Sequence, residues 1–548
     1  MSDEFRIEWT RYSFPTPANP CYHLATAVRA AGGASAKVRE VRVDGRRVRD
    51  FWVYNDDVWH KLHVLGPSRL SSVVARCDWT PGSAHAVEID LESEAEGRRL
   101  TLKSDSTAPG FGGHWNPAWK HYLSVVLREN AGLARDQEPV HITLATYADR
   151  LTDPEREIRV VGIDPLSGAP TEVPSQVYDA STWTTPTPDK YCQNTTTLEV
   201  AFLADVPAHA EKVYLIFYGN PAAPRPQYVT DLTVTGEGLE LTIENSFYRM
   251  HTQPTGGAID EIFMKMGVNA LFEHRLETNG AVQWNPGMYS PKRPWLHSSD
   301  WNPPAHYRQV RGPVFCLTKR AGGFPEYPEI DLSVTYLLYA HNPYLMYSSI
   351  TDVKQDFHCI ALRNGEFVFN HAVFDEFAWL KPDGDIGTMV IKSGPRHPRH
   401  ALRIEADTPW LAYFSREHGC GFGGMTLDLA EMRRTHGLPR KDYPFIYLAW
   451  GPWTYFSRVH TYAFGSNNPQ RMVQVGAGTT YYERMAFMPF QLGTTDEERF
   501  DQLEERYARL ADPLDVRIEL DTDDRVPEEW VPPILVAEFE EMADAEDV

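Results

Sequence analysis

The segment 283–308 concentrates side chains that are suited to binding and proton transfer. It shows neither helical nor strand periodicity, so we expect a long loop on a rigid scaffold, where functional residues usually lie. Indole rings stack on apolar C–H faces such as those of sugars, and imidazole and guanidinium groups bond hydroxyls. The segment therefore predicts one wall of a substrate site; the alternative is a loop that packs its own aromatic rings. The expected substrate-binding residues here are Trp284, Trp295, His297, Trp301 and Arg308.

A second segment, 362–379, places polar groups inside an apolar run. Polar residues in such a run are costly unless they are paired or used, so His371 is either a satisfied core histidine or a cleft residue. We expect Arg363 and Glu366 to be catalytic and Asn364 and Trp379 to bind substrate. Trp453 is expected to border the same cleft.

Two kinds of acid–base chemistry fit these residues. His306 and Tyr307 of the first segment, with His371, can act as a base and an acid, and Arg363 can neutralise a developing anion; these are the roles that the resemblance to polysaccharide lyases, described below, implies for a β-elimination. A glycoside hydrolase would instead pair Glu366 with Asp375 or Glu376, two carboxyl groups roughly 5–9.5 Å apart. A sugar-binding protein without catalysis is the third alternative.

A metal ion is not expected. The spacing His297-x-x-Asp300, with His306, offers ligand types that suit zinc or manganese, but it matches no recognised metal motif. The sequence also contains no P-loop, dinucleotide fingerprint or Gly-x-Ser-x-Gly motif. We therefore expect no cofactor.

Composition and charge limit the class of protein. The chain has 548 residues and a formal net charge of −22, which argues against nucleic acid or an anionic membrane as the partner. No apolar run reaches the roughly 20 residues that span a bilayer, and the N-terminus lacks the apolar core of a signal peptide. The 6 cysteines are irregularly spaced, which is typical of reduced thiols in the cytoplasm. The expected partner is an oligosaccharide or glycoside substrate; assembly into a homo-oligomer stays open.

The distribution of apolar residues and turns predicts an all-β, multidomain chain. Short alternating runs predict an immunoglobulin- or fibronectin-like β-sandwich over 1–106 and a second β-sandwich over 118–229. Long aromatic runs such as 332–339, 344–350 and 445–450 predict a large pair of antiparallel sheets over 230–493. One helix is expected at 495–510, capped by Thr495, before an acidic tail that completes the segment 494–548.

The segment Leu241–Met250, followed by 255–263, reads as two strand-like runs around a Gly-Gly turn. This hairpin resembles the opening of the galactose-mutarotase-like β-supersandwich, a module of mutarotases, several polysaccharide lyases and the C-terminal half of family 38 α-mannosidases. The order Gln176, Tyr218, Glu244-Asn245 is also similar to that of the mannosidases.

The resemblance implies a supersandwich over 230–493 and a protein that handles sugars. Nothing in the chain alternates strand and helix, so the catalytic α/β domain of the mannosidases is absent, and neither their activity nor their zinc is carried over. The expectation is a lyase that cleaves a glycosidic bond, with a hydrolase or a binding protein as alternatives.

Overall fold

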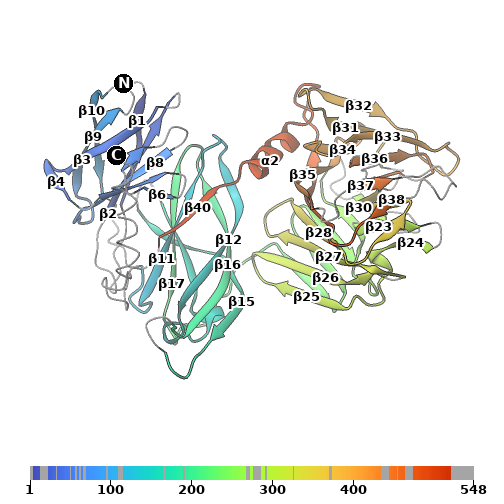
Figure 1. Cartoon of the computed structure of the whole chain (residues 1–548), viewed down its shortest axis with the longest axis horizontal. Coiled ribbons are helices and arrows are strands. Elements are labelled where there is room, and N and C mark those ends of the chain that lie inside the picture. The colour runs from blue at the N-terminus through green and yellow to red at the C-terminus, as the bar shows by residue number, and fades with distance from the viewer. Residues whose placement is uncertain are drawn as a thin grey trace.

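The computed structural model describes residues 4–12, 23–31, 34–49, 51–55, 58–60, 63–65, 70–93, 97–108, 115–164, 168–188, 192–266, 272–275, 285–290, 293–324, 326–369, 373–432, 444–452, 454–462 and 473–519. These residues form antiparallel sheets with only two α-helices among them, which confirms the expected all-β, multidomain class. In Figure 1 three groups of strands follow one another from blue through green to orange, and α2 bridges the second and third groups. No helix in the described part of the chain is long and apolar enough to cross a membrane.

The first group is a pair of sheets. One sheet has the order β1 (Phe5–Tyr12), β2 (His23–Ala30), β8 (Leu70–Arg76), β5 (Phe51–Asn55) and β6 (Val58–His60). The other has the order β10 (Arg99–Thr107), β9 (Ala84–Ser93), β3 (Ala36–Val43) and β4 (Arg46–Val48), and β7 (Val64–Leu65) also pairs with β3. Buried and exposed residues alternate along β3 and β9, as expected for strands that cover a core on one side.

The second group is completed by a strand from the end of the chain. Its larger sheet has the order β14 (Pro170–Val173), β13 (Arg159–Ile163), β17 (Glu211–Tyr218), β11 (His121–Arg128) and β40 (Asp515–Glu519). Its smaller sheet contains β12 (Arg135–Tyr147), β16 (Thr195–Val206) and β15 (Ser175–Trp183), and short helices η1 (Ala148–Arg150) and α1 (Pro154–Glu157) follow β12. The sequence predicts an acidic tail after the helix. In the structure, residues 515–519 of this segment instead form β40, which pairs with residues 124–128 of β11.

The third group begins with a meander rather than a single hairpin. It comprises β18 (Thr233–Glu237), β19 (Glu240–Glu244), β20 (Tyr248–Thr252), β21 (Ile259–Met264) and β22 (Phe272–Arg275). The run expected to form one strand over 241–250 turns back on itself at Asn245. Its side-chain Oδ1 accepts the N–H groups of Phe247 and Tyr248, and its Nδ2 donates to the carbonyls of Tyr339 and Asn342.

Two large sheets make up the rest of the third group. The six-stranded sheet has the order β24 (Arg293–His297), β23 (Asn285–Ser290), β30 (Ala361–Phe369), β37 (Thr454–Tyr462), β36 (Phe445–Trp450) and β33 (His400–Glu405). The nine-stranded sheet has the order β25 (His306–Arg311), β26 (Phe315–Phe324), β27 (Tyr327–Tyr339), β28 (Leu345–Val353), β39 (Thr480–Gln491), β35 (Cys420–Met432), β34 (Trp410–Ser415), β31 (Glu376–Leu380) and β32 (Ile386–Val390). β29 (Phe357–Cys359) pairs separately with β38 (Val473–Val475).

Aromatic rings join the two large sheets. Phe367 of β30 and Phe456 of β37 stack with Phe487 of β39, with ring centroids 5.7 and 6.0 Å apart. All three side chains are almost fully buried. This core fixes one face of the six-stranded sheet against the nine-stranded sheet, and we call the opposite face of the six-stranded sheet the outer face.

The helix α2 (Asp501–Ala511) begins later than the sequence predicts. Thr495 accepts the N–H of Glu498 in the turn before the helix, so it caps that turn and not α2. Phe500 and Leu503 are buried, and the Phe500 ring contacts Trp410, Phe414 and Phe490. The apolar stripe of the helix therefore packs on the nine-stranded sheet.

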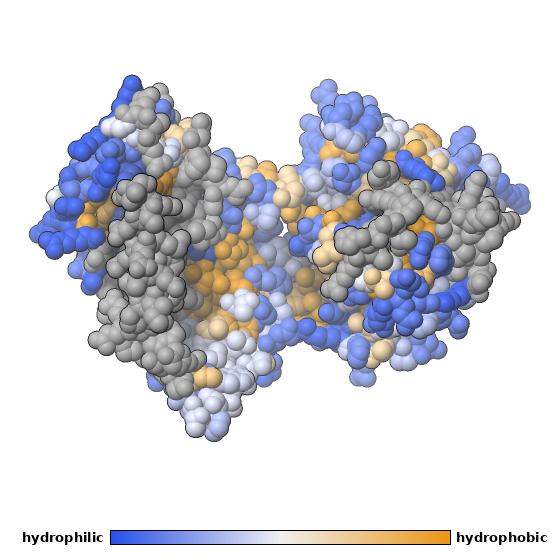
Figure 2. Space-filling view, viewed as in Figure 1, coloured by the Kyte–Doolittle hydropathy of each residue, from blue (hydrophilic) through white to orange (hydrophobic). Residues whose placement is uncertain are grey.

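The second and third groups of strands contact one another through hydrogen bonds and through apolar side chains. His141 of β12 bonds the Tyr178 hydroxyl through Nδ1 and the Tyr339 hydroxyl through Nε2, each at 2.9 Å. Gln176 accepts the N–H groups of Val314 and Phe315 at 3.2 and 3.0 Å. Figure 2 shows apolar residues gathered where these two groups face one another, while hydrophilic residues cover the visible edge of the first group.

Candidate functional site

A bulge in β30 brings Arg363 and Glu366 to the outer face. Residues three apart on a regular strand point to opposite faces, but the pairing of β30 with β37 slips by an extra residue between Asn364 and Phe367. Gly365 in this bulge has φ +52°, a left-handed conformation that glycine adopts at least cost. Asn364 and Phe367 consequently point toward the nine-stranded sheet, and Arg363 and Glu366 point away from it.

Arg363 and Glu366 form a buried ion pair at this face. Arg363 Nη2 lies 2.6 Å from Glu366 Oε2, and the two residues are only 6% and 3% exposed. Arg363 Nη1 also donates to the Ser457 hydroxyl at 3.3 Å. A buried carboxylate that is held by a guanidinium keeps its charge in a low-dielectric setting, where that charge acts strongly on a bound molecule.

His297 reaches the same carboxylate from the edge of the sheet. Its Nε2 lies 3.6 Å from Glu366 Oε1. β23 runs between β24 and β30, and Gly287 of β23 is opposite both His297 and Arg363. Because glycine has no side chain, β23 puts no obstacle between the two groups at this position.

His297 Nε2 contacts two polar groups. The indole Nε1–H of Trp295 can only donate, and it lies 2.8 Å from this nitrogen, which also lies 3.6 Å from Glu366 Oε1. The His297 side chain further accepts the backbone N–H of Asp300 at the start of η2. The site thus places an imidazole beside the Glu366 carboxylate.

The pKa of Glu366 lies below its ordinary value. Burial raises this pKa, but the positive charge of Arg363, the hydrogen bond from His297 and the charge of Arg399 together outweigh burial. Glu366 is therefore ionised at neutral pH and can accept a proton or a hydrogen bond from a ligand.

Aromatic rings and guanidinium groups alternate beside the ion pair. Arg363 Cζ lies 3.9 Å from the centroid of the Trp295 ring and 5.6 Å from that of the Tyr455 ring. Arg399 Nη2 donates to the hydroxyls of Tyr455 and Tyr447 at 3.0 and 3.3 Å. We call these seven residues the outer-face cluster: Trp295, His297, Arg363, Glu366, Arg399, Tyr447 and Tyr455.

The expected loop 283–308 consists largely of strands in the described residues. β23, β24 and the start of β25 lie within it, together with the short helix η2 (Ser298–Asp300). β24 pairs with β23 and carries Trp295 and His297 into the six-stranded sheet. The prediction of a loop was therefore wrong, although the segment does supply two residues of the cluster.

The expected pair of His306 and Tyr307 does not form, because successive residues of β25 face opposite sides. His306 and Arg308 are exposed, and Arg308 forms an ion pair with Asp179 of β15. The Tyr307 hydroxyl is buried, and it has no hydrogen-bond partner among the described residues. Burial raises the pKa of Tyr307 to about 12. β25 is the edge strand of the other large sheet, so the structure does not bring these residues to Arg363.

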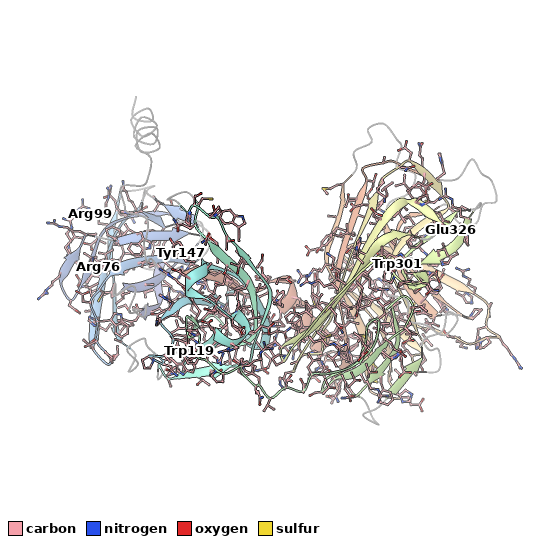
Figure 3. The ribbon with its side chains drawn as sticks, turned by 90° about the horizontal axis from the view of Figure 1, so that it is seen from below. Arg76, Arg99, Trp119, Tyr147, Trp301 and Glu326 are labelled. Atoms are coloured by element: carbon pink, nitrogen blue, oxygen red, sulfur yellow. The ribbon has the colours of Figure 1, made fainter. Side chains whose placement is uncertain are left out.

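Trp301, an expected substrate-binding residue, and Asp300 both have contacts within the protein. Trp301 is 3% exposed, and its Nε1–H donates to the Gly323 carbonyl at 2.9 Å; Figure 3 shows it among the strands of the third group. The Asp300 carboxylate accepts the backbone N–H of His297. Among the described residues no group of three His, Cys, Asp or Glu side chains could hold a metal ion.

Asn364 belongs to a polar network inside the core. Its Oδ1 accepts the hydroxyls of Tyr347 and Ser349 at 2.9 Å, and its Nδ2 donates to Glu483 Oε2 at 2.5 Å. Glu483 also forms a fully buried ion pair with Arg458. The predicted substrate-binding role of Asn364 was therefore wrong, because these groups lie between the two large sheets.

The other expected carboxylates lie on the nine-stranded sheet. Glu376 of β31 pairs with Arg416 at 2.7 Å, and Asp375 before it is exposed. Trp379 of the same strand packs over Gly387 of β32. The structure does not bring these three residues to Glu366. Trp284, His371 and Trp453 lie outside the described residues.

Sequence reasoning missed Arg399 and Tyr447 of the outer-face cluster, and it indicated Tyr455 only as part of the run 450–455 that could border the cleft. Tyr447 lies in the aromatic run of β36 and Tyr455 in that of β37, and such runs are typical of strands that pack in a core. Arg399 lies in Arg396-His-Pro-Arg-His400, which reads as a solvated basic loop. The feature that could have indicated Arg399 is its position immediately before β33, the strand at one edge of the six-stranded sheet.

Comparisons with known proteins give distant similarities. No protein-family model and no curated protein matches the chain. A protein of glycosyl hydrolase family 38 from Enterococcus faecalis is similar with a TM-score of 0.42 and 11% identity, over 73% of this chain and 47% of that one. This chain thus spans about half the length of that structure.

Smaller structures match about half of this chain, with lower TM-scores. A galactose mutarotase-like protein from Lactobacillus casei has a TM-score of 0.29 and 12% identity, over 46% of this chain and 100% of that one. A putative aldose 1-epimerase from Klebsiella pneumoniae has a TM-score of 0.33 and 10% identity, over 51% of this chain and 87% of that one. TM-scores below 0.5 decide neither the activity nor the substrate of this chain.

Proposed function

We propose that this chain is a carbohydrate-active enzyme that moves protons on a sugar at the outer-face cluster. The observation that carries the proposal is the contact of His297 and Arg363 with one buried carboxylate, Glu366. A carboxylate and an imidazole thus stand side by side, and both are groups that acid–base catalysis uses.

The surroundings of this pair suit a sugar. Trp295 and Tyr455 provide aromatic rings for apolar C–H faces, and their neighbours provide N–H and O–H donors for hydroxyls. An ion pair with only a structural role would require neither the exposed residue Arg399 nor the aromatic rings that lie between the guanidinium groups.

The reaction that best suits Glu366 is the opening and closing of a cyclic hemiacetal. Glu366 would take the proton of the anomeric hydroxyl while the C1–O5 bond breaks, and His297, entering in its protonated form, would give its proton to the ring oxygen. On closing, His297 takes that proton back and Glu366 returns its proton to the anomeric oxygen, so protons and electrons balance. Because its pKa is lowered, Glu366 is a weak base, which is adequate for an O–H proton and poorly suited to a C–H proton.

A β-elimination lyase is the second candidate. It is favoured by the two guanidinium groups of Arg363 and Arg399 near the carboxylate, since such groups neutralise an enolate-like anion. The catalytic set would then be His297 with Arg363 and Arg399, in place of Tyr307 and His306. A paired-carboxylate hydrolase has less support, because Glu376 and Asp375 lie on the other sheet.

One set of assays separates these reactions. The purified chain would be incubated with aldoses, uronates and oligosaccharides, while NMR exchange follows anomer interconversion, ultraviolet absorbance follows unsaturated products and a reducing-end assay follows hydrolysis. We expect faster anomer exchange, and we expect Glu366→Gln and His297→Gln to lose about 100-fold or more of it. His306→Gln, an exposed change on β25, is the matched control.

Two other outcomes of these assays would support a different function. An unsaturated product that depends on His297 would establish the lyase instead. Sugar binding that survives in all three variants, with no turnover in any assay, would leave a binding protein and refute the proposed enzyme.

A further inference from the structure

The strand β32 is an uncharged edge of the nine-stranded sheet, and among the described residues no strand pairs with its other side. In Figure 1 it lies at the upper rim of the third group, next to β31. Its sequence, Ile-Gly-Thr-Met-Val, contains no proline, and its pairing with β31 has no bulge. The opposite edge of the same sheet, β25, carries Arg308 and Arg311. Charges, prolines and bulges usually keep an edge strand from pairing with another chain, and β32 lacks all three.

The hydrogen bonds at the two ends of β32 show which backbone groups point away from the sheet. Before the strand, the Asp385 carbonyl accepts the N–H of Lys381 at 2.9 Å. After it, the N–H of Ile391 donates to the Asp375 carbonyl at 2.8 Å. Residues 385 and 391 thus bond toward β31, and this direction alternates along an antiparallel strand. The N–H and C=O groups of residues 386, 388 and 390 therefore point away from β31, toward the open edge.

The same three residues give the edge an apolar surface. Their side chains lie on one face of the sheet, because successive residues of a strand point to opposite faces. Ile386 is 36% exposed and Val390 is 67% exposed, and Thr388 between them is also exposed. A strand that paired with this edge would satisfy the outward backbone groups and cover both apolar side chains.

A second copy of β32 fits this edge in a register that uses all of these groups. Two identical antiparallel strands are related by a two-fold axis, and here the axis would pass between Thr388 of one copy and Thr388 of the other. The outward residues would then exchange N–H to C=O hydrogen bonds across the axis. Ile386 of each copy would lie opposite Val390 of the other, so the apolar side chains would cover one another.

The charges that flank the strand are complementary in the same register. Asp383 and Asp385 precede β32 and Lys392 follows it; all three are exposed, and they form no ion pair within the described part of the chain. Lys392 would lie opposite Gly384 of the second copy, between those two carboxylates in the sequence. Parallel pairing would instead bring like charges together, so the antiparallel arrangement is favoured. The charged groups at the ends of β31 lie one strand, roughly 5 Å, farther from the edge.

We propose that two copies of this chain associate through β32, in an antiparallel two-fold pairing centred on Thr388, so that their nine-stranded sheets become continuous. A second copy is the occupant that this edge fits, because both the apolar side chains and the flanking charges complement themselves. The inference does not depend on the proposed function, since the outer-face cluster lies on the six-stranded sheet. One strand pair buries little surface, so the dissociation constant should be on the order of 1–100 μM.

The test is sedimentation of the full chain from about 1 to about 200 μM, a range that brackets this dissociation constant. We expect a reversible change from monomer to dimer as concentration rises. Thr388→Pro removes an outward N–H that β31 does not use, and it should abolish the dimer while circular dichroism shows an unchanged fold. Val390→Lys, at an exposed position, should have the same effect because it places a charge on the edge. Thr388→Ser keeps the N–H and is the matched control that should still dimerise.

A charge exchange tests the register. Lys392→Glu and Asp385→Lys should each raise the dissociation constant about threefold, as expected for exposed ion pairs. The two changes in one chain should restore part of the lost affinity, because opposite charges then meet again across the axis. Two single variants whose effects simply add would overturn the proposed register.

Three other outcomes would overturn the proposal. The native chain could remain a monomer over the whole range. It could form a dimer that neither Thr388→Pro nor Val390→Lys weakens, which would assign the contact to another surface. It could also remain a monomer while the amides of residues 386, 388 and 390 resist hydrogen exchange, which would show that a segment of its own chain occupies the edge.

Discussion

Replacing Arg363 by glutamine should reverse the effect of pH on the stability of the outer-face cluster. In the native chain Arg363 offsets the burial of Glu366, so the pKa of Glu366 lies below its ordinary value of 4.5. The ionised carboxylate then stabilises the folded state at neutral pH, and this contribution is lost as pH falls through the lowered pKa. Without Arg363 the effect of burial dominates and raises the pKa.

The magnitude follows from the burial of the pair. Leaving a buried carboxylate without its guanidinium costs about 3–5 kcal/mol at neutral pH, and loss of the stacking of Arg363 on Trp295 adds about 0.5–2 kcal/mol. In Arg363→Gln the first cost should decrease as pH falls, because a protonated Glu366 carries no charge. Arg363→Gln combined with Glu366→Gln should be more stable at neutral pH than Arg363→Gln alone.

Hydrogen exchange followed by mass spectrometry is the appropriate assay, because a chain with several groups of strands need not unfold in one step. Peptides from β30 and β37 report the local opening free energy at pH 7 and at pH 4. Arg403→Gln, an exposed change on β33 of the same sheet, is the control. Parallel loss of protection on acidification in the native chain and in Arg363→Gln would refute the reasoning.

Three further predictions concern the scaffold. Gly365→Ala forces a side chain into a left-handed conformation at φ +52° and places its Cβ 3.1 Å from Glu483 Oε2, so β30 should lose at least 1–2 kcal/mol of opening free energy by hydrogen exchange. Burial lowers the pKa of His141 to about 4, so this side chain is neutral in the folded state at neutral pH. The free energy of unfolding should decrease as pH falls from about 6.5 toward 4, because the unfolded state takes up the proton first. In thermal unfolding, His141→Gln should show a smaller decrease over this pH range. Leu503→Ala leaves a cavity at a fully buried position of α2 and should lower the free energy of unfolding by about 2–5 kcal/mol. Limited proteolysis after α2 should then become faster. The control Gln491→Ala, at an exposed position of β39, should not have this effect.

The strands that sequence reasoning locates best are those with strong apolar character. The run 445–450 coincides with β36, and 332–339 lies within β27. Both strands lie in the core, where alternation or continuous burial decides the element. The helix is also found by its apolar stripe, but its start is displaced, since a capping signal at Thr495 closes a preceding turn instead.

The outer-face cluster could be predicted only in part. The sequence indicates Arg363, Glu366, Trp295 and His297 as candidates, but it assigns them to different roles and surrounds them with residues that lie elsewhere. The reason is the bulge at Gly365. One extra residue changes which side chains share a face, so Asn364 moves into the core and Arg363 meets Glu366, and no local periodicity reveals this.

The residues that suggest the mannosidase-like order in the sequence have structural contacts in this chain. Gln176 accepts two backbone N–H groups at the start of β26, and Asn245 closes the turn between β19 and β20 while it binds the end of β27. Such contacts join strands in a given way, whatever reaction the scaffold supports. They therefore indicate an arrangement of sheets and say nothing about the chemistry at Glu366.

The two faces of β30 make different kinds of contact. Asn364 ties β30 to Glu483 and Ser349 on the inner side, and Phe367 packs beside it, so the backbone at the bulge is held by contacts that lie apart from the outer-face cluster. The same backbone carries Arg363 and Glu366 outward. A substitution on the inner side should therefore disturb the outer-face cluster through the position of the bulge, whereas a substitution at the exposed residue Arg399 should leave the bulge intact.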